Sequence, residues 1–123
     1  MLHWNELRHF QPEEFRCPCC GAQDMDPAFM RRLDAARALA GQPFAVASGF
    51  RCPRHNRAVG GIPNSAHLLG LAADLVCSDS RSRFLMLDAL LRAGFTRLGL
   101  SKEQGFLHVD MAPDLPPGVV WLY

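Results

Sequence analysis

A single carboxylate within the most apolar stretch of the chain constrains the fold more than any other feature. The stretch reads SAHLLGLAADLVC from Ser65 to Cys77, and Asp74 is its only acidic residue. Its last seven residues are typical of a strand, on which side chains alternate, so Asp74 shares a face with Ala72 and Val76. An ionised carboxylate is costly to bury unless a cation or a metal pairs with it. The chain must therefore fold so that Asp74 either reaches water or meets such a partner.

The length and charge of the chain narrow the classes of protein to which it can belong. We expect residues 1–123 to form one domain, on which the cysteine-bearing residues 1–24 pack. Thirteen Lys and Arg residues against twelve Asp and Glu give a net charge of +1 without a basic stripe, which argues against nucleic-acid binding. No apolar run approaches about 18 residues and no signal-peptide pattern is visible, so we expect no membrane insertion, and we expect a monomer.

Local signals predict two helices. The first spans residues 27–40, with Asp26 as its N-cap and Gly41 as its stop. Its apolar side consists of Phe29, Met30, Leu33, Ala36 and either Leu39 or Ala40. The second follows Asp79 or Ser80 as its N-cap and ends at Gly94. Its predicted buried stripe consists of Phe84, Leu87, Leu90 and Leu91.

The remaining pattern predicts strands around a long loop. We expect a short helix at 12–15 and strands within 43–50, 71–77, 95–101 and 105–112, the last two forming a hairpin. The terminal residues 119–123 are expected to pack back onto the domain. Residues 51–70 are predicted to be irregular, and a loop of that length in a compact domain is typical of a functional role. The order of elements indicates an α+β fold with a small, mostly antiparallel sheet and helices packed on one face.

Two of the predicted strands carry the residues of a metal site. In GFLHVDMA, His108 shares a strand face with Phe106 and Asp110. If this strand lies beside the one that carries Asp74, both side chains point into one site, and His67 reaches it from the turn at Gly70. Two imidazoles and one carboxylate suit zinc and leave a fourth position open, which is typical of a catalytic site.

These residues carry a resemblance to a known family. SAHLLGLAAD has the Ser-x-His-x-x-Gly-x-Ala-x-Asp pattern, and SGFRCPRHNRAVGG, FLHVD and FQPEEFRCPCCG add similar strings over most of the chain. The chain thus resembles the zinc D-alanyl-D-alanine carboxypeptidases, in particular their small phage and bacterial branch. Relatives of that family include D-Ala-D-Ala dipeptidases, phage L-Ala-D-Glu endolysins and the hedgehog amino-terminal domain. The resemblance implies the α+β fold that these proteins share.

The resemblance also implies roles for single residues. His67, Asp74 and His108 would bind one zinc ion per chain, and Arg51 would hold the carboxylate or carbonyl oxygen of the substrate. Ser65 would hydrogen-bond near the substrate. The implied reaction is zinc-assisted hydrolysis, in which the metal activates water and polarises the scissile carbonyl.

The implied substrate is a peptidoglycan stem peptide, cut most simply by a D-Ala-D-Ala carboxypeptidase activity. An L-Ala-D-Glu endopeptidase, a hydrolase of another small peptide, and a weak or inactive zinc-bearing binding module on the same fold remain alternatives. Without a visible signal peptide, the protein would be made in the cytoplasm and act on the cell wall if released or exported, which fits a prophage-type origin.

The general base is left open by the sequence. Several relatives place Asp or Glu three residues before the last histidine ligand, where this chain has Gly105. The candidates here are Asp110 and Glu103, which lies in the turn before the strand. Asp110 is favoured because it shares the strand face of His108, and geometry comes first for a general base.

Five cysteines are many for a short chain. Cys17 and Cys20 have metal-site spacing, but no second such pair completes four sulfur ligands. Cys52 would be able to form a disulfide with Cys17, Cys19 or Cys20. Reduced, buried thiols are the favoured interpretation, and Cys77 is predicted to lie in the core.

Overall fold

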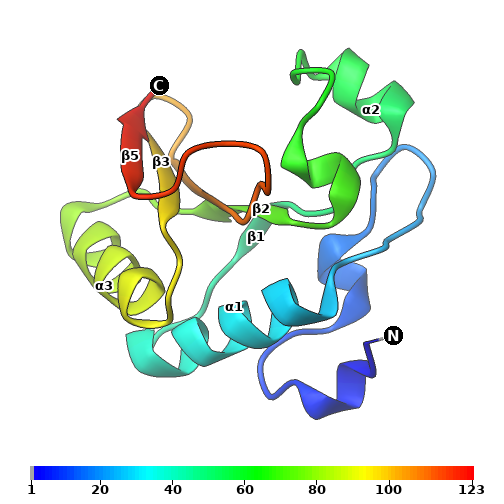
Figure 1. Ribbon diagram of the computed structural model, residues 1–123. Helices are drawn as coiled ribbons and strands as arrows, with labels where there is room; N and C mark the ends of the chain where they lie inside the picture. The colour runs from blue at the N-terminus through cyan, green and yellow to red at the C-terminus, as the bar shows by residue number, and fades with distance from the viewer. Residues whose placement is uncertain (1) are drawn as a thin grey trace.

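A five-stranded sheet lies at the centre of the computed structural model, which describes residues 2–123 (Figure 1). Its strand order is β1-β2-β4-β3-β5, and all neighbours are antiparallel except β3 and β5. The strands are β1 (Val46–Ser48), β2 (Ala72–Val76), β3 (Arg97–Ser101), β4 (Phe106–Asp110) and β5 (Val119–Leu122). The helices are α1 (Pro27–Ala40), α2 (Pro53–Ala58) and α3 (Ser80–Arg92), with 3-10 turns η1 (Trp4–Glu6), η2 (Pro12–Phe15) and η3 (Ala66–Leu69). The predicted α+β class and the β3–β4 hairpin are confirmed.

Helix α1 begins and ends where its capping residues predict. The Asp26 carboxylate accepts a hydrogen bond from the Phe29 amide at 2.9 Å, and Gly41 adopts the left-handed conformation that ends the helix. The buried residues are Phe29, Met30, Leu33, Ala36 and Ala40. Of the two alternatives for the last position, Ala40 is therefore buried, whereas Leu39 is 45% exposed.

The buried stripe predicted for α3 is wrong in part. Asp79 caps the helix, but its buried residues are Met86, Ala89 and Leu90. Phe84 and Leu91 are exposed. Helix α3 packs against α1 through a face that has the small residue Ala89 at its centre, which allows the two helices to approach closely. The predicted stripe consists of large apolar side chains, and it therefore did not include Ala89.

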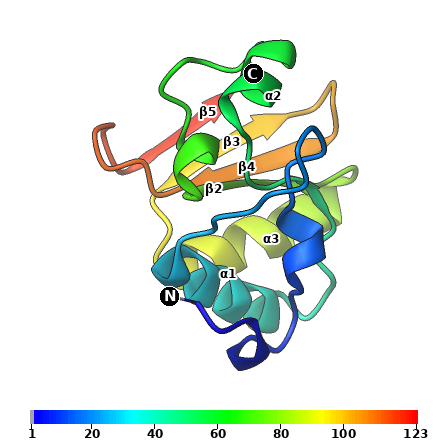
Figure 2. The same cartoon turned by 90° about the vertical axis from the view of Figure 1, so that its right-hand side faces the viewer.

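The two faces of the sheet have different chemistry. Figure 2 shows α1 and α3 on one side of the sheet and α2 on the other. Toward the two long helices, β2 and β4 contribute Ala73, Leu75, Leu107 and Val109 to the hydrophobic core. The alternate residues of the same strands, among them Asp74 and His108, point to the opposite face. The sheet thus separates an apolar core from a polar site.

Residues 51–70, predicted to be irregular, contain α2 and η3. Pro53 stands at the first position of α2, and the Cys52 sulfur accepts a hydrogen bond from the His55 amide at 3.4 Å. The buried Asn56 side chain then donates to the Ile62 carbonyl at 2.8 Å and closes the loop. This ordered segment covers the polar face of the sheet (Figure 2).

Both ends of the chain are tied to the domain. Phe10 and Phe15 join the core, and the Phe50 amide donates to the Phe15 carbonyl at 3.0 Å. The terminal segment forms β5, an edge strand parallel to β3. Within residues 2–123, no helix has both the length and the apolar character needed to cross a membrane.

Gly70→Ala is expected to destabilise the protein by about 2 to 5 kcal/mol. Gly70 has φ +70°, and a methyl group there would overlap the Asp24 carbonyl oxygen and lie 2.9 Å from the Met25 Cα. Gly41→Ala is the control, since Gly41 has φ +67° and open space around it, and it should cost only about 1 to 2 kcal/mol. Urea unfolding measures both, and equal losses would show that the backbone contact at Gly70 is unimportant.

Candidate metal centre

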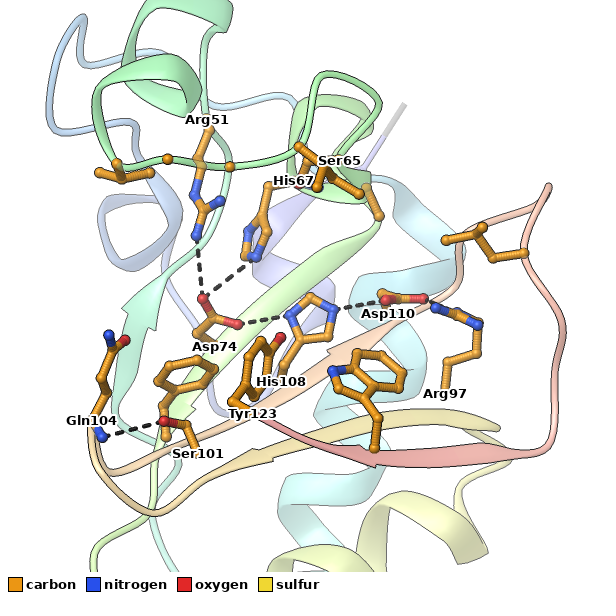
Figure 3. A pocket seen from close by; sticks show the side chains of 18 of the residues that line it. Arg51, Ser65, His67, Asp74, Arg97, Ser101, Gln104, His108, Asp110 and Tyr123 are labelled. Carbon is orange, nitrogen blue, oxygen red and sulfur yellow. Dashed lines mark hydrogen bonds and ion pairs between the residues drawn. The ribbon is translucent and has the colours of Figure 1, made fainter.

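The pairing of β2 with β4 brings the first two predicted ligands together. Asp74 lies directly opposite His108 in the antiparallel register, and His67 reaches the same point from η3 (Figure 3). The donor atoms of the three residues all lie within 4.8 Å of one another, and all three side chains are buried. The neighbouring strands that the sequence required are therefore present.

His67 is oriented by the backbone around it. Its Nδ1 lies 2.7 Å from the Gly49 carbonyl oxygen, which can only accept, so Nδ1 carries the hydrogen. The Ser65 hydroxyl accepts a hydrogen bond from the His67 amide at 3.2 Å and caps η3. This arrangement leaves Nε2 facing the Asp74 carboxylate, at 3.5 Å from Oδ2. The motif serine thus positions the histidine, although it also lines the cleft.

His108 lies between two carboxylates. Its Nδ1 is 2.8 Å from Asp74 Oδ1, and its Nε2 is 2.7 Å from Asp110 Oδ2. Burial lowers the pKa of His108, but the hydrogen bonds to Asp110 and Asp74 outweigh that effect and raise it. Asp110 therefore fixes the ring orientation, while Nδ1 is the nitrogen directed toward His67 and Asp74.

Asp74 is held as an anion. Burial favours its neutral form, yet hydrogen bonds from His108 and His67 and their charges bring its pKa well below the usual range. Arg51 adds an ion pair, with Nη2 at 3.3 Å from Asp74 Oδ2. The buried Asp74 carboxylate thus has the positively charged partners that were predicted for it from the sequence.

The donor set fits a divalent cation such as zinc. The hydrogen bond between Nδ1 and the Gly49 carbonyl leaves His67 Nε2 facing a carboxylate oxygen of Asp74, where a cation would bind in place of a proton between the two groups. Asp110 at the far side of His108 supplies the outer carboxylate that commonly accompanies a metal-binding histidine. Two histidine nitrogens and one carboxylate leave a fourth position for water or substrate.

Arg51 is fixed at the edge of this centre by two further contacts. Its Nε donates to the Ser48 hydroxyl and its Nη1 to the Asn56 amide oxygen, each at 3.2 Å. Gly61 lies against this pair, and a Cβ at that position would overlap Asn56 Oδ1. The guanidinium is therefore pre-oriented, and sequence reasoning missed Asn56 because a buried asparagine leaves no local pattern.

Both oxygens of Asp110 are occupied. Oδ2 contacts His108, and Oδ1 accepts from Arg97 Nε at 2.7 Å and from the Ala112 amide at 3.0 Å. Burial raises the pKa of Asp110, but these partners lower it below its ordinary value. Arg97 in turn lies 5.0 Å from the centre of the Trp121 ring. These contacts show a carboxylate that holds the His108 ring in place.

A cleft of about 670 Å³ opens over the centre. Arg51, Asp74, His67 and His108 line it together with Glu103 from the β3–β4 turn. Aromatic residues of β4 and the C-terminal segment form a further part of the wall: Phe106, Trp121 and Tyr123. Neither Trp121 nor Tyr123 is predicted from the sequence to lie at the site, although VVWLY alternates large residues as a strand facing a site would.

A comparison with protein families matches residues 8–110 to the family described as Peptidase M15. The matched range contains His67, Asp74 and His108 with the elements that carry them. A search of curated proteins found no match. M15 peptidases are zinc-dependent hydrolases, in agreement with the donor set of this cleft. The chain belongs to the Peptidase M15 family of metallopeptidases.

Proposed function

We propose that the protein hydrolyses peptidoglycan stem peptides, with the activity of a D-Ala-D-Ala carboxypeptidase. The observation that carries this proposal is the fixed guanidinium of Arg51 beside the three metal donors in one cleft. A planar guanidinium binds a carboxylate through two parallel hydrogen bonds, so the cleft suits a peptide that ends close to the scissile bond.

In this proposal, His67 Nε2, His108 Nδ1 and an Asp74 oxygen hold one zinc ion. Zinc bound there would polarise the scissile carbonyl and lower the pKa of water toward about 7. Arg51 binds and orients the terminal carboxylate of the peptide. Asp110 holds the His108 ring in its orientation. The aromatic residues of the cleft wall exclude water from one side of the substrate.

The proton acceptor that we propose is Glu103. Asp110, the candidate favoured by strand parity, is engaged by His108, Arg97 and Ala112 and lies on the Nε2 side of His108, whereas Nδ1 faces Asp74. Glu103 lines the same cleft from the turn that follows β3, and its exposed position suits a group that exchanges protons with water. Asp110 accordingly acts as a positioning residue.

Metal analysis of the purified protein, followed by incubation with purified muropeptides and mass spectrometry, tests the proposal. We expect zinc at this centre and loss of the terminal D-Ala, abolished by a chelator and restored by added zinc. A cut after L-Ala would replace the carboxypeptidase by an endopeptidase. Zinc without cleavage would instead leave a metal-bearing binding module, which acts on the wall or a partner without turnover.

Arg51→Lys is expected to lower kcat/KM for stem peptides with a free C-terminus by about 10- to 100-fold. Lysine keeps the charge, but it loses the paired hydrogen bonds to a carboxylate, which contribute about 1.5–3 kcal/mol. The control is the same peptide with an amidated C-terminus, for which wild type and variant should differ much less. Equal losses on both peptides would mean that Arg51 serves the metal centre rather than the terminal carboxylate.

A further inference from the structure

Three cysteines gather where the N-terminal loop meets the segment after β1, and a fourth, Cys19, lies next to them in the chain. The sulfur atoms of Cys17, Cys20 and Cys52 lie within 4.8 Å of one another. Cys17 and Cys20 flank a tight turn, closed by the Gly21 amide donating to the Cys17 carbonyl at 2.8 Å. Cys52 arrives from a part of the chain that is 35 residues away from Cys17. The fold therefore assembles a sulfur cluster that no local spacing reveals.

Cys19 lies in the same turn, between Cys17 and Cys20, with an exposed side chain. The side chain of Cys52 raises the pKa of the Cys19 thiol, and the positive charge of Arg54 opposes that shift. Tetrahedral zinc with bonds of about 2.3 Å requires sulfur atoms roughly 4 Å apart, which the spacing of Cys17, Cys20 and Cys52 accommodates. Cys19, next to Cys20 in the chain, is the candidate for the fourth ligand.

Backbone amides point at the sulfurs as they do in thiolate metal sites. The Cys52 amide donates to Cys17 Sγ and the His55 amide to Cys52 Sγ, each at 3.4 Å. Such donors stabilise negative charge on sulfur, and they hold the ligands in place before a metal binds.

A disulfide satisfies this arrangement less well. One bond between two of the sulfurs leaves the other two thiols unpaired at the same point, and two bonds would have to cross a tight cluster. None of the five cysteines in the described chain forms a disulfide, and Cys77 lies apart in the core. The buried Cys17 and the exposed Cys19 and Cys20 also correct the expectation of uniformly buried thiols.

We propose that Cys17, Cys19, Cys20 and Cys52 form a second metal site, which binds a thiophilic divalent cation such as zinc. On binding, each thiol releases its proton and forms one bond to the metal, so that four thiolates and Zn²⁺ carry a net charge of −2, offset in part by Arg54. This site is structural, because all four positions around the metal are filled by the protein.

The second site joins the N-terminal loop to the segment that carries Arg51. Cys52 directly follows Arg51, whose amide donates to the His67 carbonyl at 3.2 Å. The Phe50 amide already donates a hydrogen bond to the Phe15 carbonyl, and a bound metal would add coordinate bonds beside that backbone contact. The proposal stands whether or not the chain cleaves peptidoglycan.

The full-length protein, purified with reductant and without chelator, tests this site by zinc content and by cobalt substitution. We expect about two zinc ions per chain, and thiolate-to-cobalt charge-transfer absorption in the cobalt form. The double variant C19S/C20S should lose one zinc and that absorption, since it lacks two ligands with exposed side chains. Asp74→Asn should lose the other zinc and keep the absorption.

Cys77→Ala is the matched control, because it removes a cysteine outside the cluster and should leave both zinc ions in place. Circular dichroism verifies that each variant is folded. Wild-type protein with one zinc that only Asp74→Asn removes would overturn the proposal, and counting alkylated thiols would then show whether a disulfide takes the place of the metal. Two zinc ions retained in C19S/C20S would equally overturn it.

Discussion

Asp74→Asn is expected to empty the metal centre and to lower peptidase activity at least about a thousandfold, a loss of about 4 kcal/mol of transition-state stabilisation. Asp74 is the anion that His67, His108 and Arg51 all face, so no other side chain can replace its charge. Asparagine keeps the shape of the side chain but offers only one neutral oxygen. Zinc content by metal analysis and turnover of muropeptides measure the two effects.

The same variant should lose stability even without metal. In the metal-free wild type, the Asp74 carboxylate compensates the partly buried guanidinium of Arg51 and the charge of His108, and removing the partner of a buried charge costs about 3–5 kcal/mol. Urea unfolding in the presence of a chelator isolates this part of the effect. Asp88→Asn is the control, since Asp88 forms an exposed pair with Arg92 and should change stability by less than about 0.5 kcal/mol. Full zinc content in Asp74→Asn would remove Asp74 from the ligand set.

Glu103→Gln is expected to lower kcat by about 10²- to 10⁴-fold while zinc remains bound, because general base catalysis contributes about that much. Asp110→Asn should behave differently. It leaves His108 without its outer carboxylate, so zinc affinity should fall by about 10- to 100-fold, and added zinc should restore most of the activity. Titration with zinc buffers and kcat at saturating zinc separate the two residues.

Gln104→Ala is the control for the turn, since Gln104 lines the same cleft beside Glu103 but carries no titratable group. It should retain most of the kcat of the wild type. If Glu103→Gln kept full activity and Asp110→Asn lost it at saturating zinc, the role of base would return to Asp110. The pH–rate profile identifies the base independently, because the acidic limb reports protonation of the base. That limb should disappear in the variant that lacks the base.

The sequence predicted those parts of the molecule whose signals are local. Helix α1 carries its own start and stop at Asp26 and Gly41, and strand alternation places Asp74 and His108 on the polar face. Helix α2 was missed because cysteine is an unusual N-cap and the surrounding residues are typical of turns.

The contacts that sequence reasoning could not find join distant residues. Arg97 looks like an ordinary surface charge in the sequence, yet it pairs with Asp110 at 2.7 Å with both side chains buried. Asn56 and the cluster that includes Cys52 depend in the same way on where loop 51–70 is placed. Tertiary placement of loops follows from packing over the whole domain, which residue patterns do not encode.

The two-faced sheet also determines how β2 and β4 can pair during folding. A slip of one residue would turn Asp74 toward α1 and α3, and it would bring Leu75 to the polar cleft. The misplaced carboxylate would be buried without a counter-charge, so an alignment slipped by one residue is much less stable than the native one. The residues proposed to hold the metal therefore also discourage this slip, since it would bury the Asp74 carboxylate among apolar side chains.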